Sequence, residues 1–245
     1  MKIVVTSGSG SEVVVDSAAL SAVILNSEFV YFYDAAEVAE DDLIHPQDWA
    51  VPALLQAPFR RFEPFRLLRG PSDRDPDGLT VWQTIERQLA EVKPAWRLDD
   101  VRANARFRTQ VERLLDVTMA TNFVGSAIAT KLLHKKRPNL IPIVDQELWA
   151  FYKPGGGLRS ADDGRSAYHA LSPREVTDLA FGQVRRDLLR QGNRFALEKV
   201  GETVASRGAP VLTTLRILEL TIWLVRQPGG MGLVSSVREL HDGQE

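Results

Sequence analysis

The 245-residue sequence contains no cysteine and only four histidines. The absence of cysteine excludes disulfide bonds, a thiol nucleophile, thiolate-bound zinc and cysteine-ligated iron–sulfur clusters. No two histidines have the spacing of a metal-binding pair such as HxxxH, so we expect no metal centre built on histidine and no cofactor. A carboxylate site for magnesium remains open.

The sequence also lacks any run near the roughly 20 apolar residues that a membrane-spanning helix needs. Its N-terminal segment has a short apolar strand where a signal peptide would carry a longer apolar core. The composition, 44% hydrophobic and 25% charged with a net charge of −2, is ordinary for a soluble globular protein. We therefore expect a cytoplasmic protein without a membrane partner.

The charges are unevenly distributed along the chain. Residues 34–48 contain six acids and no lysine or arginine, whereas residues 102–137 contain eight bases and two acids. A local field of this kind can hold a polyanion such as DNA even when the whole chain is nearly neutral. The alternative is two solvated faces of opposite charge that balance each other.

The periodicity of apolar residues predicts a mainly α-helical protein with a small N-terminal β-hairpin. The hairpin is expected at Lys2–Thr6 and Glu12–Asp16, joined by a turn rich in glycine and serine. Helices are expected from about Asp16 to Asn26, in 79–92, 101–119 and 127–134, after Ser172 and through Pro210–Arg226. We divide the chain into residues 1–100 and 101–245, which share one core.

The segment 122–152 carries the most information about function. A helix ends before it, and Gly125 can take a positive φ or let a partner approach closely. Ser126 is then placed to cap a new helix, whose first-turn amide groups could bind phosphate. After Pro138 the chain runs extended to Asp145, which is placed to cap the next helix.

These residues resemble the helix–hairpin–helix DNA glycosylase (HhH-GPD) superfamily. Val124-Gly125 matches its hairpin, Ala129 matches the alanine of the following helix, and Pro142-Ile143-Val144-Asp145 matches the segment that ends in its catalytic aspartate. The chain is more similar to an uncharacterised bacterial domain family of unknown function. Three sets of residues carry that second resemblance: 129–133, 136–138 and 142–145; the aromatic and acidic start at 31–34; and 215–219 with Trp223.

The glycosylase resemblance implies a helical bundle of HhH-GPD type that binds duplex DNA and hydrolyses an N-glycosidic bond with Asp145. Two positions depart from the superfamily pattern. Phe123 replaces the first hairpin glycine, and Ala127 stands where strand-cleaving members carry a lysine. Lys131 lies one turn beyond Ala127 on the same helix face and is a weaker catalytic candidate. The expected DNA-binding residues are Val124, Gly125, Ser126, Lys131, His134, Lys135, Lys136 and Arg137.

Each of these residues also has a simpler structural explanation. Asp145 can be a helix cap alone, and the basic residues can form a solvated surface. Trp149 and Tyr152 could stack on a flipped base, but their helical spacing favours the core. Glu219 lies within a strongly apolar helix, where a charge needs a partner, and Arg216 is the expected one. Two other functions stay open: a non-catalytic module that binds DNA or a partner, and an enzyme acting on a small nucleoside or sugar.

Overall fold

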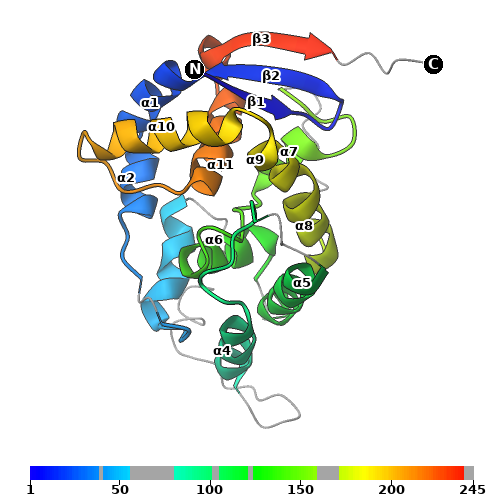
Figure 1. The fold of residues 1–245 in the computed structure, drawn as a ribbon. Helices are drawn as coiled ribbons and strands as arrows, with labels where there is room; N and C mark the ends of the chain where they lie inside the picture. Colours follow the sequence, from blue (N-terminus) through cyan, green and yellow to red (C-terminus); the bar gives the residue numbers. More distant parts are fainter. Residues whose placement is uncertain (39–40, 56–79, 101–104, 121–123, 159–170, 240–245) are drawn as a thin grey trace, which may run out of the picture.

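The computed structural model describes residues 1–38, 41–55, 80–100, 105–120, 124–158 and 171–239. Within them the protein is mainly helical with one small antiparallel sheet, as the sequence predicts (Figure 1). The helices and helical turns are α1 (Ser17–Leu25), α2 (Glu28–Asp34), η1 (Pro46–Leu55), α4 (Val81–Glu91), α5 (Ala105–Met119), α6 (Ser126–Lys136), α7 (Gln146–Tyr152), α8 (Pro173–Leu179), η3 (Ala180–Val184), α9 (Arg185–Leu189), α10 (Asn193–Ala205), α11 (Thr214–Arg226) and η4 (Gly230–Leu233).

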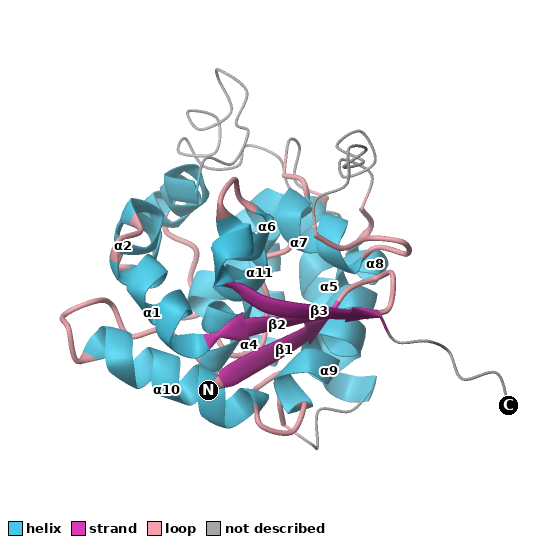
Figure 2. Ribbon diagram, turned by 90° about the horizontal axis from the view of Figure 1, so that it is seen from above, coloured by secondary structure: helices cyan, strands magenta, loops and turns pink. Residues whose placement is uncertain are grey.

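The predicted hairpin consists of β1 (Lys2–Thr6) and β2 (Ser11–Asp16), and a third strand, β3 (Val234–Glu239), pairs with β2. The sheet covers one side of the helices (Figure 2). The sequence analysis did not predict β3, because the strand has little apolar alternation and most of its residues are exposed. The outer edge of β1 is covered by Asn193, whose side chain bonds both the amide and the carbonyl of Val4.

Polar residues predicted to start helices do so. Asp16 accepts the amide hydrogens of Ala18 and Ala19 at the start of α1. Ser172 forms a capping box with Glu175 at α8. Thr80, which the sequence analysis did not name as a cap, forms another at α4. The helix expected from residue 210 starts later, because Thr213 caps α11.

The main core runs through the whole described chain, from Ile3 in β1 to Leu233 in η4. Helix α11 lies near its centre, and every residue of α11 except Thr214 and Trp223 is buried. Trp49 is also fully buried, whereas Trp82, Trp96 and Trp223 pack against the core with part of their surface exposed. Among the helices described, none is long and apolar enough to cross a membrane. The expected loop at 69–78 lies outside the described residues. Of the expected loop at 153–165, residues 159–165 lie outside them.

Candidate functional site

The candidate site is centred on Asp145, the N-cap of α7. Its Oδ1 accepts the amide hydrogens of Glu147 and Leu148, both at 3.0 Å. The side chain is half-buried, and Oδ2 has no hydrogen bond recorded among the described residues. The predicted cap is therefore confirmed. One oxygen is held in place by the helix, and the other has no hydrogen-bond partner within the described part of the chain.

The extended segment before Asp145 is held by two buried side chains. Glu219 Oε1 on α11 lies 2.8 Å from the amide nitrogen of Ile143 and accepts its hydrogen. Thr130 Oγ1 on α6 accepts the amide hydrogen of Val144 at 3.0 Å. Asp145 is thus placed between α6 and α11 by contacts that sequence spacing does not reveal.

Lys131 is the charged side chain whose pKa responds to Asp145. It is 4% exposed, and burial lowers the pKa of its ammonium group, while the Asp145 carboxylate opposes that shift. The backbone carbonyl of Lys131 accepts a hydrogen bond from the hydroxyl of Tyr33 at 2.8 Å. Ala127, one turn earlier on α6, is also buried. The Asp145 carboxylate therefore favours the charged form of this buried lysine.

The turn before α6 differs in detail from the expectation. Gly125, not Ser126, is the N-cap, and its φ is −80°, so it does not use a positive φ. A Cβ added at Gly125 would meet nothing within 4 Å, which leaves its backbone approachable. Val124 and Ser126 are buried, and Phe123 lies outside the described residues.

The basic residues at the end of α6 face the interior, although the sequence analysis placed them on a DNA-binding surface. His134, Lys136 and Arg137 are at most 6% exposed. Lys135 is partly buried and donates to the carbonyls of Asp34 at 3.2 Å and Ala36 at 2.9 Å, at the end of α2. In this structure these four side chains bind the protein itself.

Their partners come largely from the acidic stretch at 34–48. Lys136 Nζ lies 2.9 Å from the fully buried Asp48 and 3.5 Å from Asp41. Arg137 bonds the carboxylate of Asp42 and also donates to the carbonyl of Leu89 at 2.8 Å. The two oppositely charged segments of the sequence therefore pair with each other around α6.

A buried polar cluster surrounds α6 and α11, and we call it the Arg216 cluster: Tyr33, Asp34, His134, Arg216 and Glu219. The expected contact of Arg216 with Glu219 is present, with Nη1 and Oε2 3.4 Å apart. The shorter contacts of Arg216 go to Asp34, at 2.9 and 3.1 Å. The sequence analysis missed Asp34 as a partner, because 182 residues separate it from Arg216.

Burial changes the titration of this cluster. It raises the pKa of Glu219 to about 8, against the opposing effects of Arg216 and the Ile143 amide. It lowers the pKa of His134 to about 3, and the nearby Arg216 guanidinium adds to this shift. His134 Nδ1 donates to the carbonyl of Ile141 at 2.7 Å, which is consistent with a neutral imidazole.

The two aromatic candidates of α7 have different surroundings. Tyr152 is fully buried, and its hydroxyl donates to Asp187 Oδ2 at 2.9 Å. Trp149 is partly exposed, and its buried Nε1 has no hydrogen-bond partner among the residues that the structure describes. Tyr152 therefore lies in the core as expected, whereas Trp149 packs against the core with part of its surface exposed. Glu147 is not a free surface carboxylate, because Arg226 Nε lies 2.8 Å from its Oε2.

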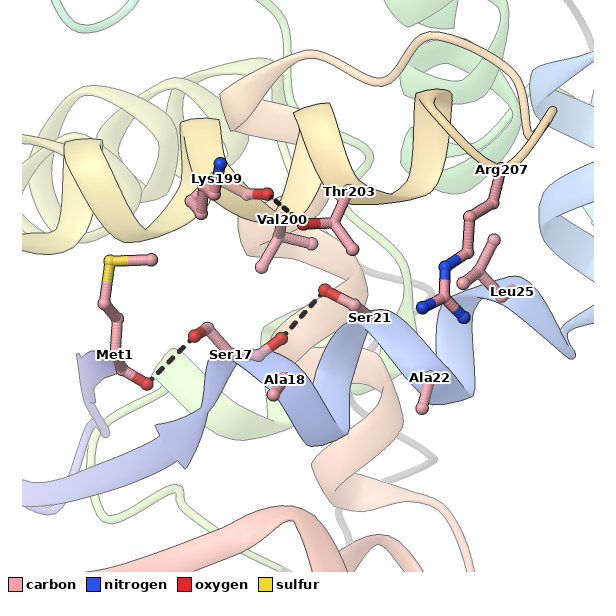
Figure 3. A pocket seen from close by; sticks show the side chains of 10 residues that line it. All are labelled: Met1, Ser17, Ala18, Ser21, Ala22, Leu25, Lys199, Val200, Thr203 and Arg207. Carbon is pink, nitrogen blue, oxygen red and sulfur yellow. Dashed lines mark hydrogen bonds between the residues drawn. The ribbon is translucent and has the colours of Figure 1, made fainter.

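A cavity of about 320 Å³ lies between α1 and α10, away from the residues named for the Asp145 site (Figure 3). The hydroxyls of Ser17, Ser21 and Thr203 line it, and each donates to a backbone carbonyl. In the part of the chain that the structure describes, no three histidine, aspartate or glutamate side chains gather as metal ligands would. Asp145 and its neighbours therefore remain the candidate functional site.

Comparison with known proteins gives a family but no activity. The model described as "Family of unknown function (DUF6308)" matches residues 31–226. The chain belongs to this family. No curated protein and no solved structure matches the chain. The expected membership of a family of unknown function is thus confirmed, and the match carries no information on the glycosylase resemblance.

The limits of the DUF6308 match correspond to the site and not to the sheet. The match begins in α2 and ends at Arg226, the last residue of α11, so it contains Asp145, Lys131 and the whole Arg216 cluster. Strands β1, β2 and β3 lie outside it. The region shared by the family is therefore the helical part that builds the candidate site.

Proposed function

We propose that the protein is a hydrolase of N-glycosidic bonds in which Asp145 is the catalytic carboxylate. The observation that carries the proposal is the state of this side chain: the α7 amides hold Oδ1, and no protein group in the described residues is bonded to Oδ2. A carboxylate fixed in this way can face a developing positive charge without first reorganising. The sequence pattern around it, from Val124-Gly125 to Pro142–Asp145, supports the same reaction class through its resemblance to the DNA glycosylases.

The reaction requires one negative charge and one water molecule. The bond between the sugar C1′ and the base nitrogen breaks, and its electron pair leaves with the base. Asp145 Oδ2 stabilises the resulting oxocarbenium-like sugar and orients the water that adds to C1′. The water proton goes to the departing base, so the products are a free base and a sugar with a hydroxyl at C1′.

Duplex DNA with a flipped nucleotide is the first substrate that we propose. The turn at Val124-Gly125 and the amide groups at the start of α6 would contact phosphate. Two exposed arginines, Arg106 and Arg113, lie on α5, which packs against α6, and they add positive charge near this turn. Binding should therefore weaken as salt increases.

A nucleoside or sugar not attached to DNA is the second candidate. It is favoured by the burial of His134, Lys136 and Arg137, which removes three of the expected phosphate contacts from the surface. An enzyme for a small substrate needs the Asp145 carboxylate but no extended basic surface. The two substrates therefore differ in whether duplex DNA binds at all.

Strand cleavage is not part of the proposal. The position of the lyase lysine holds Ala127, and Lys131 is 4% exposed. We expect borohydride to trap no covalent adduct with DNA that carries an abasic site. A trapped adduct that disappears in Lys131→Ala would instead identify Lys131 as a nucleophile.

The test compares two aspartates with the same capping role. Asp16 accepts two amide hydrogens at the start of α1, as Asp145 does at α7, and asparagine caps helices about as well as aspartate. Wild type, Asp145→Asn and Asp16→Asn are assayed for binding to plain duplex and to duplex with an abasic-site analogue at two salt concentrations. Base release is then measured from a panel of damaged duplexes and from free nucleosides.

The proposal expects base release by wild type and by Asp16→Asn, and none by Asp145→Asn. Preference for the abasic analogue with release from a damaged duplex would support the DNA substrate, whereas release from nucleosides without duplex binding would support the second candidate. Hydrolysis by Asp145→Asn at the wild-type rate would overturn the mechanism. Equal, salt-sensitive binding to both duplexes without any base release would leave a DNA-binding module.

A further inference from the structure

Asp145 follows a short segment, residues 141–144, that belongs to no helix and to no sheet of the described residues. Such a segment has no ladder of backbone hydrogen bonds to fix its position, so its amide groups need other partners. The Ile141 amide donates to the carbonyl of Arg137 at 3.0 Å. The amides after Pro142 depend on side chains. The two amides directly before Asp145 have such partners, and both partners are buried. They are Glu219 on α11 and Thr130 on α6.

The structure assigns Thr130 and Glu219 as the positioning residues of the candidate site, which hold Asp145 in place by accepting the amide hydrogens of Val144 and Ile143. This inference rests on the proposed function. Neither residue would touch the substrate, and each acts through the backbone of the segment that carries the carboxylate.

Each of the two anchors is itself held. Thr130 Oγ1 donates to the carbonyl of Ser126 at 2.7 Å, so its lone pairs point to Val144. Glu219 is contacted through its other oxygen by Arg216, and Arg216 is fixed by the Asp34 carboxylate. A chain of contacts therefore runs from α2 through α11 to the segment before Asp145.

Packing also limits other positions of the segment. Ile141, Ile143 and Val144 are at most 3% exposed, so a shift of the segment would disturb the core. A catalytic group displaced by about 1 Å can lose about a hundredfold in rate. Loss of an anchor should therefore lower kcat while leaving KM nearly unchanged, because the anchors do not face the substrate.

The chain offers a matched control for each anchor. Thr118 on α5 is buried like Thr130 and donates to the carbonyl four residues earlier at 2.7 Å, but no hydrogen bond to an amide is recorded for its oxygen. Glu86 on α4 accepts the amide hydrogen of Ile44 at 2.8 Å, the same chemistry and distance as Glu219 and Ile143. Both controls belong to elements that do not carry Asp145.

The experiment compares Thr130→Val with Thr118→Val, and Glu219→Leu with Glu86→Leu. On the substrate that wild type hydrolyses, we expect kcat to fall about tenfold to a hundredfold in the two anchor variants and to stay within about twofold in the controls. Glu219→Gln keeps an oxygen that can accept from Ile143, so it should recover most of the kcat lost in Glu219→Leu. Equal losses in anchor and control variants would overturn the assignment.

A second measurement does not depend on activity. Amide hydrogen exchange is followed at Glu147 and Leu148, the two donors to Asp145 Oδ1, under native conditions. Exchange at these amides should accelerate at least tenfold in Thr130→Val and not in Thr118→Val. If wild type hydrolyses nothing but this difference is found, the positioning role stands and the proposed function fails; if exchange is unchanged, the positioning role fails.

Discussion

The guanidinium of Arg216 lies against the carboxylate of Asp34, with Nε 2.9 Å from Oδ1 and Nη2 3.1 Å from Oδ2. This two-point contact joins α11 to the end of α2, and both side chains are 7% exposed. The ring of Tyr33 lies beside it, with the Arg216 guanidinium carbon 5.1 Å from the ring centroid. A cation in a largely buried helix is therefore neutralised by a residue from the other half of the chain.

Removal of Asp34 should strongly destabilise the fold. In Asp34→Ala the buried Arg216 loses its closest carboxylate and keeps the 3.4 Å contact with Glu219 and the contact with the Tyr33 ring. A buried charge without a close partner costs about 3–5 kcal/mol. Urea unfolding measures this loss directly. The control is Glu198→Ala, which removes an exposed ion pair with Arg194 and should cost less than about 0.5 kcal/mol. Similar losses of unfolding free energy in both variants would show that the buried Asp34–Arg216 pair contributes no more than an exposed pair.

Stability should fall on the acid side because of His134. Its pKa is about 3 in the folded protein and 6.5 in the unfolded chain, so between these values only the unfolded chain binds the proton. The free energy of unfolding therefore decreases as the pH falls from about 6.5 toward 3. His134→Asn keeps a donor for the Ile141 carbonyl but does not titrate. Its advantage over wild type should grow with acidity in urea titrations between pH 6.5 and 4.5, and parallel profiles would contradict this cause.

Glu219 should have the opposite effect. Its pKa is about 8 in the folded protein and 4.5 in the unfolded chain, so between these values the folded protein binds more protons. The contribution of Glu219 to stability is therefore lost as the pH rises from about 4.5 toward 8, against the contribution of His134 below pH 6.5. Glu219→Gln should show a shallower decline than wild type over this range in the same titrations. An equally steep decline in both proteins would mean that Glu219 stays charged beside Arg216 in the folded protein over this range.

Replacement of Lys136 should affect folding more than binding. Lys136→Met leaves the fully buried Asp48 without its 2.9 Å ion pair, and we expect a loss of about 3–5 kcal/mol. The double variant Lys136→Met with Asp48→Asn removes both charges and should regain part of that stability. Unchanged stability of Lys136→Met, with weaker binding to duplex DNA, would instead return this lysine to a DNA-binding surface.

A close approach of two glycine-containing loops gives a test of local packing. A Cβ at Gly8 would lie 1.7 Å from the carbonyl oxygen of Lys153, so Gly8→Ala must push the two loops apart. We expect a loss of about 1–3 kcal/mol. Gly182→Ala is the control, because its Cβ would meet nothing within 4 Å. It should be neutral or stabilising in thermal unfolding, and equal effects of the two substitutions would contradict the contact.

Local signals predicted many of the helices, and the structure shows how several of them begin. Asp16, Thr80, Ser172 and Asp145 each start a helix because their side-chain oxygens bond amides two or three residues ahead, and that chemistry is visible in a few consecutive residues. Strand β3 was not predicted, because its pairing with β2 joins residues more than 200 positions apart and little of it is buried. Helices α2 and α10 were not predicted either, so the missed elements include local ones as well as this strand of distant pairing.

The candidate site was predicted in part. Asp145 and Lys131 were named from one helix, one turn and one extended segment. Their anchors, Thr130 and Glu219, carried no signal for this role, since a threonine within a helix usually bonds only its own helix. The basic residues of α6 were assigned to the surface, because a run of charges does not show which acids will face it in the fold.

The sequence by itself determined the helical composition, the start of α7 at Asp145 and the local pair of Arg216 with Glu219, because each depends on neighbours within a few residues. Only the tertiary structure decided where the charges go. It placed the acids of 34–48 against Lys136 and Arg137 and brought Asp34 to Arg216. The physical reason is the cost of burying a charge: once α6 and α11 enter the core, their cations need carboxylates from wherever in the chain the packing can bring them.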